Sequence, residues 1–301
     1  MNNLVLLVAC FVLGALLRRS GRLPDNGPAA LNAFIINVAL PALILRHLHA
    51  VEITSALVLA AAVAWVLFAL SIAFFGIVGR AAGLAPQTVG ALTLTGGLAN
   101  TSFLGVPMIE AFYGSGGVAL GLVIDQLGSY LALATLGIVV AAMYSGAALD
   151  RRAIARKIAL FPPLIAVLAA FLLRPFEYPE WLAATLSRLG DTLAPLALVS
   201  VGAQVRLGEL TGNAKKLALG LGFKLVVGPA VHVGLFVALS GIDTDHTRII
   251  FFEAAMAPMI GAAIVATEHK LDPPLTTLMV GIGIPLSFLT VPMWWYVLGM
   301  L

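Results

Sequence analysis

The sequence predicts an all-α integral membrane protein with ten transmembrane helices, arranged as two inverted repeats of five helices each. Three observations predict this fold: the composition, a series of ten apolar stretches, and proline motifs that recur at one spacing. Hydrophobic residues make up 61% of the 301 residues and charged residues 10%, whereas a soluble domain has roughly 25% charged residues. The mean hydropathy of +1.05 agrees, so we expect membrane-embedded structure throughout the chain.

The ten apolar stretches are long enough, or nearly so, to cross a hydrocarbon core about 30 Å thick. They cover about residues 4–17, 28–45, 53–79, 88–112, 117–143, 158–174, 182–205, 217–239, 249–267 and 275–299. Arginines follow the first stretch instead of preceding it, which favours a retained span over a cleaved signal peptide. Cys10 is the only cysteine, so an internal disulfide is excluded.

The distribution of Arg and Lys predicts the orientation, because cytoplasmic loops are enriched in these residues. The loops after odd-numbered spans hold Arg18, Arg19, Arg22, Arg80, Arg151, Arg152, Arg156, Lys157, Arg206, Lys215, Lys216 and Lys270; the opposite loops hold Arg46, Arg174 and Arg248. Both termini are therefore expected on the periplasmic or extracellular side. Since this asymmetry explains the basic pI of 9.2, nucleic-acid binding is not expected.

Proline motifs recur in the two halves of the chain. Asn37 stands four residues before Pro41 in the second span, and Asp191 stands four before Pro195 in the seventh, an offset of 154 residues (191 minus 37). The same offset superposes the fourth span on the ninth, and both contain a polar residue followed by proline. Five crossings separate the copies, so the second must be inverted relative to the first. The predicted repeats cover residues 1–150 and 151–301.

The fourth and ninth spans contain the expected binding site. Asn100, Thr101 and Ser102 precede a proline in the fourth span, and Glu253 precedes Pro258 in the ninth. Proline frees backbone carbonyls, which are tolerated at membrane depth only where protein or a water-filled cavity satisfies them. Broken helices offer N-termini to anions and carbonyls to cations. The paired breaks therefore indicate a transport site, with hydrogen bonding between helices as the structural alternative.

The candidate residues form two groups. Those expected to bind substrate are Asn100, Thr101, Ser102, Pro107, Pro258, Met259, Asn37, Pro41 and Pro195. Those expected to couple transport to an ion are Glu253, Asp125, Gln126 and Lys224. Ionisable groups inside a membrane are costly and are functional candidates by default. For Glu253 the alternative is a position near the outer interface, and for Asp125 it is a structural ion pair with Lys224.

Other chemistry is not expected. The sequence has no nucleotide-binding motif, so ATP is excluded as an energy source. A nucleophile with its base, or a set of metal ligands, is also missing from the spans, so no enzyme activity, cofactor or resident metal is predicted. The coupling ion is left open between a proton and a sodium ion held by Asn100, Thr101 and Glu253.

These motifs resemble those of the auxin efflux carrier family over essentially the whole chain. The matching residues are Asn100, Gly105, Val106 and Pro107 of an N-x-x-x-x-G-[IV]-P string, together with the pairs Leu40-Pro41 and Ala194-Pro195. The long cytoplasmic loop of many plant members, the PIN-type auxin carriers, is absent, so the chain resembles the short bacterial members. Location in the bacterial inner membrane is implied.

The resemblance implies a fold related to sodium/proton antiporters and bile-acid symporters, with discontinuous spans 4 and 9 that cross. It also implies a scaffold of spans 1, 2, 6 and 7, moving spans 3 to 5 and 8 to 10, elevator-type alternating access and a homodimer. In related bile-acid symporters a glutamate placed like Glu253 helps to bind Na⁺, whereas the resemblance to auxin carriers implies no need for Na⁺.

The sequence thus predicts secondary active transport of a small organic anion across the lipid bilayer. Candidate substrates are mono- or dicarboxylates such as malonate or malate, or an auxin-like aryl acetate. The alternatives are a cation/proton antiporter, a bile-acid-type sodium symporter and, from another class, a membrane ligand sensor.

Overall fold

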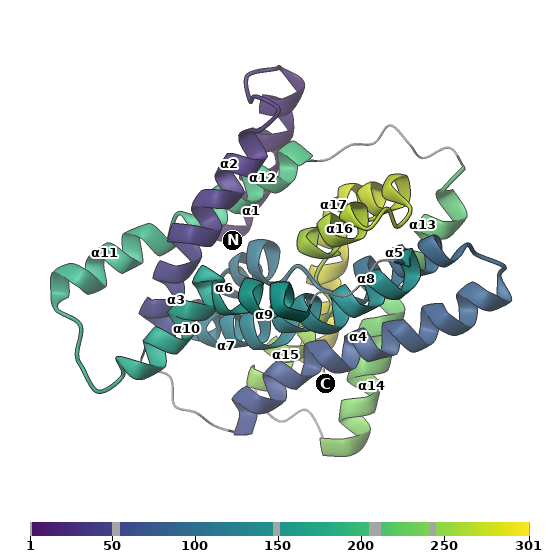
Figure 1. Cartoon of the computed structure of the whole chain (residues 1–301). Coiled ribbons are helices and arrows are strands. Elements are labelled where there is room, and N and C mark those ends of the chain that lie inside the picture. The colour runs from purple at the N-terminus through teal and green to yellow at the C-terminus, as the bar shows by residue number, and fades with distance from the viewer. Residues whose placement is uncertain (1, 50–54, 147–150, 205–211, 241–244, 301) are drawn as a thin grey trace. The chain divides into compact units, whose positions relative to one another are not determined.

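The computed structural model describes residues 2–49, 55–146, 151–204, 212–240 and 245–300. Arg206, one of the expected cytoplasmic cations, lies outside these residues. Within the described ranges the regular elements are all helices, and the one β-type pairing is an antiparallel bridge between Ala99 and Pro258 (Figure 1). The predicted all-α class is therefore confirmed.

The helices have the following bounds. In the first half they are α1 Asn2–Arg19, α2 Gly27–Phe34, α3 Leu40–Leu48, α4 Ser55–Ala81, α5 Pro86–Gly97, α6 Val106–Tyr113, α7 Val118–Val123 and α8 Ile138–Ser145. In the second half they are α9 Arg151–Ala159, α10 Pro162–Leu172, α11 Glu180–Gly190, α12 Leu193–Gln204, α13 Ala214–Gly222, α14 Gly228–Ser240, α15 Asp245–Ala254, α16 Ile260–Glu268 and α17 Pro273–Met300. Short irregular turns are η1 Ile35–Ala39, η2 Thr101–Gly105, η3 Ser115–Gly117, η4 Ile124–Tyr130, η5 Leu133–Gly137 and η6 Phe223–Val227.

Among the π-helical turns, three end two residues before a proline. The turns η1, η2 and η6 precede Pro41, Pro107 and Pro229 respectively. Proline has no N–H, and its ring clashes with the carbonyl four residues earlier. A wider turn accommodates both defects, so the prolines explain the loosening at these three turns.

Six helical segments of the described residues are long and apolar enough to cross a membrane. They are Gly27–Leu48, Val58–Ala81, Ser115–Ser145, Glu180–Gln204, Ala214–Leu235 and Pro273–Met300. The expected fourth and ninth spans do not form single helices, because α5 ends at Gly97 and α15 ends at Ala254 before the chain resumes as η2 and α6, or as α16. The helical content and these segments support an integral membrane protein.

The chain folds into two compact units built from non-contiguous segments. Unit 1 comprises Met1–Ser55, Ser102–Leu122 and Ala155–Val205, and unit 2 comprises Ala56–Thr101, Val123–Ile154 and Arg206–Leu301. The boundaries after Ser55, Thr101 and Leu122 fall inside the third, fourth and fifth expected spans. Each unit therefore collects helices that are distant in sequence.

In unit 1 the backbones of α1 and α12 touch, and α3 packs against α10 and α11. A Cβ atom added to Gly14 would lie 2.1 Å from the carbonyl oxygen of Val199, and one added to Gly202 would lie 2.0 Å from that of Phe11. Glycine permits such an approach, as it does in many membrane helix pairs. These two glycines hold the first and last parts of unit 1 together.

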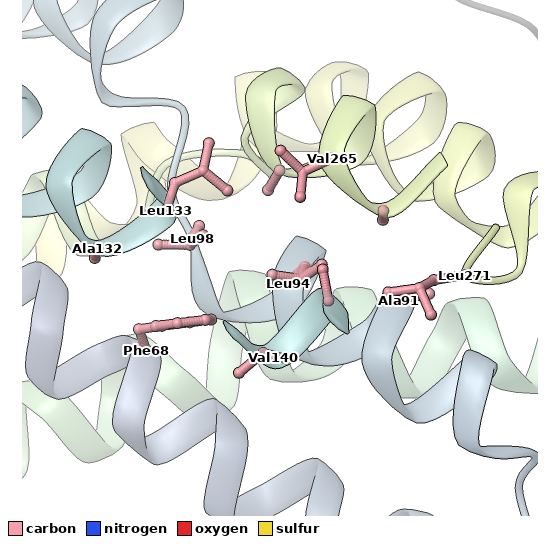
Figure 2. Packing of buried hydrophobic residues seen from close by; sticks show 12 residues of the cluster. Phe68, Ala91, Leu94, Leu98, Ala132, Leu133, Val140, Val265 and Leu271 are labelled. Atoms are coloured by element: carbon pink, nitrogen blue, oxygen red, sulfur yellow. The ribbon is translucent and has the colours of Figure 1, made fainter. Parts of the chain in front are cut away.

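The core of unit 2 surrounds the end of α5. Leu94 of α5 and Leu98, the residue that follows this helix, are buried between Phe68 of α4 and Val265 of α16, which approach from opposite sides (Figure 2). Leu98 is 1% exposed and lies where the helical structure of the expected fourth span is interrupted, directly after the end of α5. Apolar packing thus fixes the helix end from which the broken segment starts.

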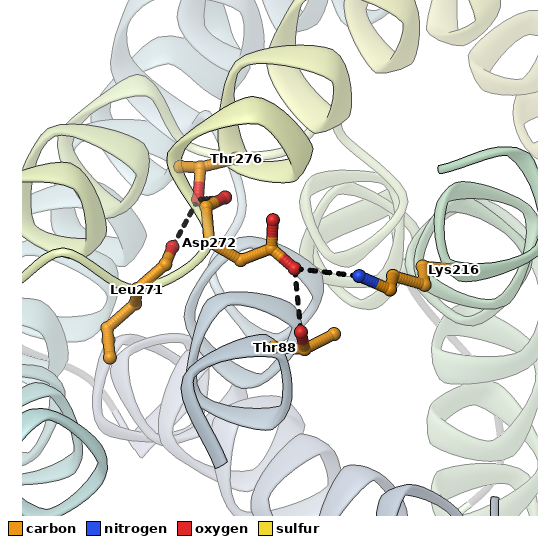
Figure 3. Close-up of polar contacts among 5 residues, drawn as sticks. All are labelled: Thr88, Lys216, Leu271, Asp272 and Thr276. Carbon is orange, nitrogen blue, oxygen red and sulfur yellow. Dashed lines mark hydrogen bonds and ion pairs between the residues drawn. The ribbon is translucent and has the colours of Figure 1, made fainter. Parts of the chain in front are cut away.

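A polar cluster joins three other elements of unit 2. Asp272, in the turn between α16 and α17, accepts a 2.6 Å hydrogen bond from Thr88 Oγ1 of α5 and pairs at 3.2 Å with Lys216 Nζ of α13 (Figure 3). Its φ of +41° lies in the left-handed region, which Asp and Asn tolerate better than other residues with a Cβ. The carboxylate therefore connects α5, α13 and this turn.

Asp272→Asn is expected to lower the free energy of unfolding by about 1–2 kcal/mol, because the charge-assisted bond to Lys216 is lost while the turn conformation remains accessible. The measurement is the Tm of the purified protein in detergent. The matched control is Asp25→Asn, which removes an ion pair to Arg18 from a side chain that is 96% exposed and should change Tm little. Equal shifts for the two variants would contradict the structural role of the cluster.

Candidate functional site

The two broken segments pair with each other in unit 2. Asn100 N donates to Ala257 O at 2.9 Å, and Met259 N donates to Leu98 O at 3.0 Å. These bonds bring Ala99 opposite Pro258 in an antiparallel bridge. Backbone groups that each helix leaves unsatisfied at its break are therefore satisfied by the other break, which is the requirement for irregular backbone at membrane depth.

Asp125 is buried beside this crossing and is hydrogen bonded on both oxygens. Thr101 Oγ1 donates to its Oδ1 at 2.6 Å, and Gln126 Nε2 donates to its Oδ2 at 2.5 Å. Asp125 and Gln126 belong to η4, and each is 1% exposed. Two donors can replace the water that an ionised carboxylate loses on burial. Three predicted residues, one from the substrate group and two from the coupling group, are thus in contact.

Glu253 is buried in a different environment. Its side chain is 0% exposed, so it does not reach water, and neither carboxylate oxygen has a hydrogen-bond partner among the described residues. The charges of Asp125 and Lys224 both act on it. A buried carboxylate without donors is unfavourable, so this group requires a proton or a nearby cation.

A small cavity lies beside Glu253. Its volume is about 10 Å³, and its lining includes Glu253, Thr101 and Ser129. The Ser129 hydroxyl is buried and has no hydrogen-bond partner in the described part of the chain. A space of this size accommodates about one water-sized guest when polar groups surround it. The cavity therefore has room for about one water molecule and is too small for an organic substrate.

Lys224 completes the buried charged group. It lies in the π-helical turn η6, its side chain is 0% exposed, and Nζ donates to Ala254 O at 3.1 Å. The acceptor is the last residue of α15. The expected alternative, an ion pair between Lys224 and Asp125, is not what this lysine forms in the structure. It binds instead at the end of α15.

The remaining predicted residues belong to unit 1. Asn37 Nδ2 donates to Ala33 O of its own helix at 2.7 Å, while Pro41 and Pro195 lie in the first turns of α3 and α12. Ser102 lies in η2 and is partly buried. Asn37, Pro41 and Pro195 therefore shape their own helices.

Pro107 lines a second cavity, within unit 1. Its volume is about 130 Å³, and its lining also includes His47, Glu110 and Asp191. Pairing of Asp191 with Arg188, which stands three residues earlier, is not among the ion pairs of the described residues. His49 does not line this cavity, and its Nε2 lies within hydrogen-bond distance, 2.7 Å, of Phe176 O.

Two buried residues of unit 2 were missed by the sequence reasoning. Ser129 follows Asp125 by four residues, and His232 follows Lys224 by eight, spacings that place residues near one face of a helix. His232 is 0% exposed and packs edge-on against Phe251, with 5.6 Å between ring centroids. The helical spacing to an ionisable residue was the signal that could have found both.

Comparison with known proteins identifies the family of the chain. The model of the membrane transport protein family matches residues 1–295. An uncharacterized transporter of Methanothermobacter thermautotrophicus is 28% identical over 292 residues, covering 95% of this chain and 94% of that protein. Another from Methanocaldococcus jannaschii is 26% identical over 314 residues, covering 98% of each chain. These matches indicate a transport protein and not an enzyme. The chain therefore belongs to the membrane transport protein family, that of the auxin efflux carriers.

Proposed function

We propose that this protein is a secondary active transporter of a small organic anion, and that the buried cluster of Glu253, Asp125 and Lys224 couples transport to a monovalent cation. The substrate class is a mono- or dicarboxylate such as malonate or malate, or an auxin-like aryl acetate. The observation that carries the proposal is the pairing of two broken segments beside buried charged groups.

Charge balance supports the coupling. When all three side chains are ionised, two carboxylates and one ammonium group leave a net charge of one negative unit in a buried site. A net charge is costly inside a membrane, so the cluster favours the uptake of one further positive charge. A proton or a sodium ion supplies it, and either one links the ion gradient to movement of the site.

The crossing also supports anion binding. Helix α16 begins at Ile260, immediately after the second break, and the first N–H groups of a helix are free to bind an anion. Asn100, which is 3% exposed, lies opposite Ala257 in the same crossing. We propose that the amide of Asn100 and the start of α16 hold the substrate carboxylate, with Thr101 joining the substrate region to Asp125.

The wider architecture is part of the proposal. We propose ten spans in two inverted repeats, with discontinuous crossed spans 4 and 9, and elevator-type alternating access. The division into two compact units supports the elevator, because an elevator requires one body that moves against another. We also propose a homodimer in the bacterial inner membrane, with both termini on the periplasmic side. The asymmetry of Arg and Lys supports this orientation.

Uptake by proteoliposomes tests the function. Labelled malonate, malate and indole acetate are offered under an imposed H⁺ or Na⁺ gradient, and at least one is expected to accumulate in response. Asn100→Ala is expected to reduce the initial rate by about 10-fold or more, because a buried polar group of the substrate then lacks its partner. The control is Asn213→Ala, which removes an amide before α13.

Two results would contradict the proposal. Uptake that does not respond to either ion gradient would exclude the proposed coupling. An Asn100→Ala variant with the same uptake rate as the control would exclude Asn100 from the substrate site. The runner-up function is cation/proton antiport, which the two buried carboxylates favour. In that case addition of Na⁺ alone, without an organic anion, releases protons that a pH-sensitive dye detects.

A further inference from the structure

We infer that Lys224 is a built-in cation at the C-terminal end of α15, where a coupling sodium ion would bind in a sodium-driven carrier, and that removal of its ammonium group converts the cluster into a Na⁺ site. The inference rests on the proposed function, since it names the coupling device of the same site. Of the two coupling ions left open above, it selects the proton, because Lys224 already occupies the place of Na⁺ in the wild-type cluster.

The end of α15 is a site for a cation. Carbonyls in the last turn of a helix lack helical donors and carry partial negative charge. Here Phe251 O and Phe252 O accept the N–H of Ala255, and Glu253 O accepts that of Met256. The next carbonyl, Ala254 O, accepts Lys224 Nζ at 3.1 Å. The lysine thus supplies the positive charge that broken helices in transporters otherwise offer to Na⁺.

The structure holds Lys224 in this place by an unusual local geometry. Proline at 229 removes the donor for the carbonyl four residues earlier, Leu225 O, and the chain widens into η6. Trp294 Nε1 of α17 replaces that donor at 2.8 Å. The residue next to Lys224 is therefore anchored from another helix. A side chain placed this way and 0% exposed has a defined position.

Oxygen groups of the kind that ligate Na⁺ lie at the cavity that Glu253 lines. Glu253 presents two carboxylate oxygens without hydrogen-bond partners in the described residues, and Ser129 presents a hydroxyl in the same condition. Both line the cavity of about 10 Å³. Truncation of Lys224 adds the volume of its side chain and leaves Glu253 near Asp125 with no cation. Two uncompensated carboxylates in a buried site then attract the ion that the lysine replaced.

Thermal unfolding of the purified protein in NaCl and in choline chloride, at equal ionic strength and without organic substrate, tests this inference. The wild type is expected to have the same Tm in both salts. Lys224→Ala is expected to have a lower Tm in choline and to gain about 5 °C or more in saturating Na⁺, because a ligand of the native state stabilises it by mass action.

Two controls complete the experiment. Lys216→Ala removes a lysine of unit 2 that pairs with Asp272 and should respond equally to both salts. The double variant Lys224→Met with Glu253→Gln removes the positive and the negative partner together, so it should fold in both salts and ignore Na⁺.

Each outcome is decisive. If folded Lys224→Ala protein can be purified only in Na⁺, this supports the inference as strongly as a Tm shift. Any of three results overturns the inference. The wild-type Tm rises with Na⁺; the Lys224→Ala variant ignores Na⁺ or fails to fold in both salts; or the double variant fails to fold in both salts. No organic anion is used in this experiment. If only the proposed transport activity fails, Lys224→Ala still gains Tm in Na⁺, whereas the wild type takes up no organic anion in proteoliposomes.

Discussion

Glu253→Gln is expected to uncouple transport from the ion gradient. Gradient-driven uptake should fall by about 5- to 150-fold, the factor that corresponds to typical coupling free energies between two sites. Glutamine has nearly the shape of glutamate but can neither take a proton nor carry a negative charge. In the wild type this side chain is 0% exposed and its oxygens have no hydrogen-bond partner among the described residues. The charge of the group, and not a structural bond, is therefore what the variant removes.

The measurement is the initial rate of labelled anion uptake with and without the imposed ion gradient. The control is Glu268→Gln at the end of α16 in the same unit, where the side chain is exposed. Because the charges of Asp125 and Lys224 balance when residue 253 is neutral, the Tm of Glu253→Gln is expected to stay within a few degrees of the wild type. Retention of full gradient dependence would exclude Glu253 as the coupling group.

Gly202→Ala is expected to lower the free energy of unfolding by about 3 kcal/mol, the upper end of the usual effect of overpacking. The added methyl group would lie 2.0 Å from Phe11 O, which is a backbone atom and cannot turn away as a side chain can. The helices α1 and α12 must separate to make room. Gly14→Ala is expected to act similarly, since its Cβ would lie 2.1 Å from Val199 O.

The Tm and the yield of monodisperse protein measure this effect. Gly76→Ala in α4 is the control, because its Cβ would meet no atom within 4 Å and alanine favours a helix over glycine. We expect the control to be as stable as the wild type or more stable. If Gly202→Ala and Gly76→Ala unfold at the same temperature, the close contact between α1 and α12 is wrong.

The sequence reasoning was most successful where a local property determines the structure. High apolar content requires helices in a membrane, because each backbone group must be paired within the chain, and the structure is helical. Proline removes a donor wherever it stands, so Pro107 and Pro258 correctly marked interrupted segments. The family resemblance carried by Asn100, Gly105 and Pro107 is also confirmed.

The candidate site was predicted less completely. Thr101, Asp125 and Gln126 were named as candidates, and the structure brings them into contact, whereas Asn37 bonds within its own helix. Ser129 was overlooked because serine is common in membrane helices and has no charge to single it out. The partner of Lys224 was also unpredictable, since a backbone carbonyl carries no sequence signal.

Composition, helical class, the positions of the breaks and the family are therefore properties that this sequence determines by itself, because each depends on residue type or on short spacing along the chain. The tertiary structure alone decided that Asn100 pairs with Ala257, that Trp294 supplies the donor missing at Leu225, and that the ammonium group of Lys224 lies at the end of α15. These contacts join residues 30 to 157 positions apart (254 minus 224; 257 minus 100). Their geometry follows from how the helices pack in three dimensions, which a one-dimensional pattern does not specify.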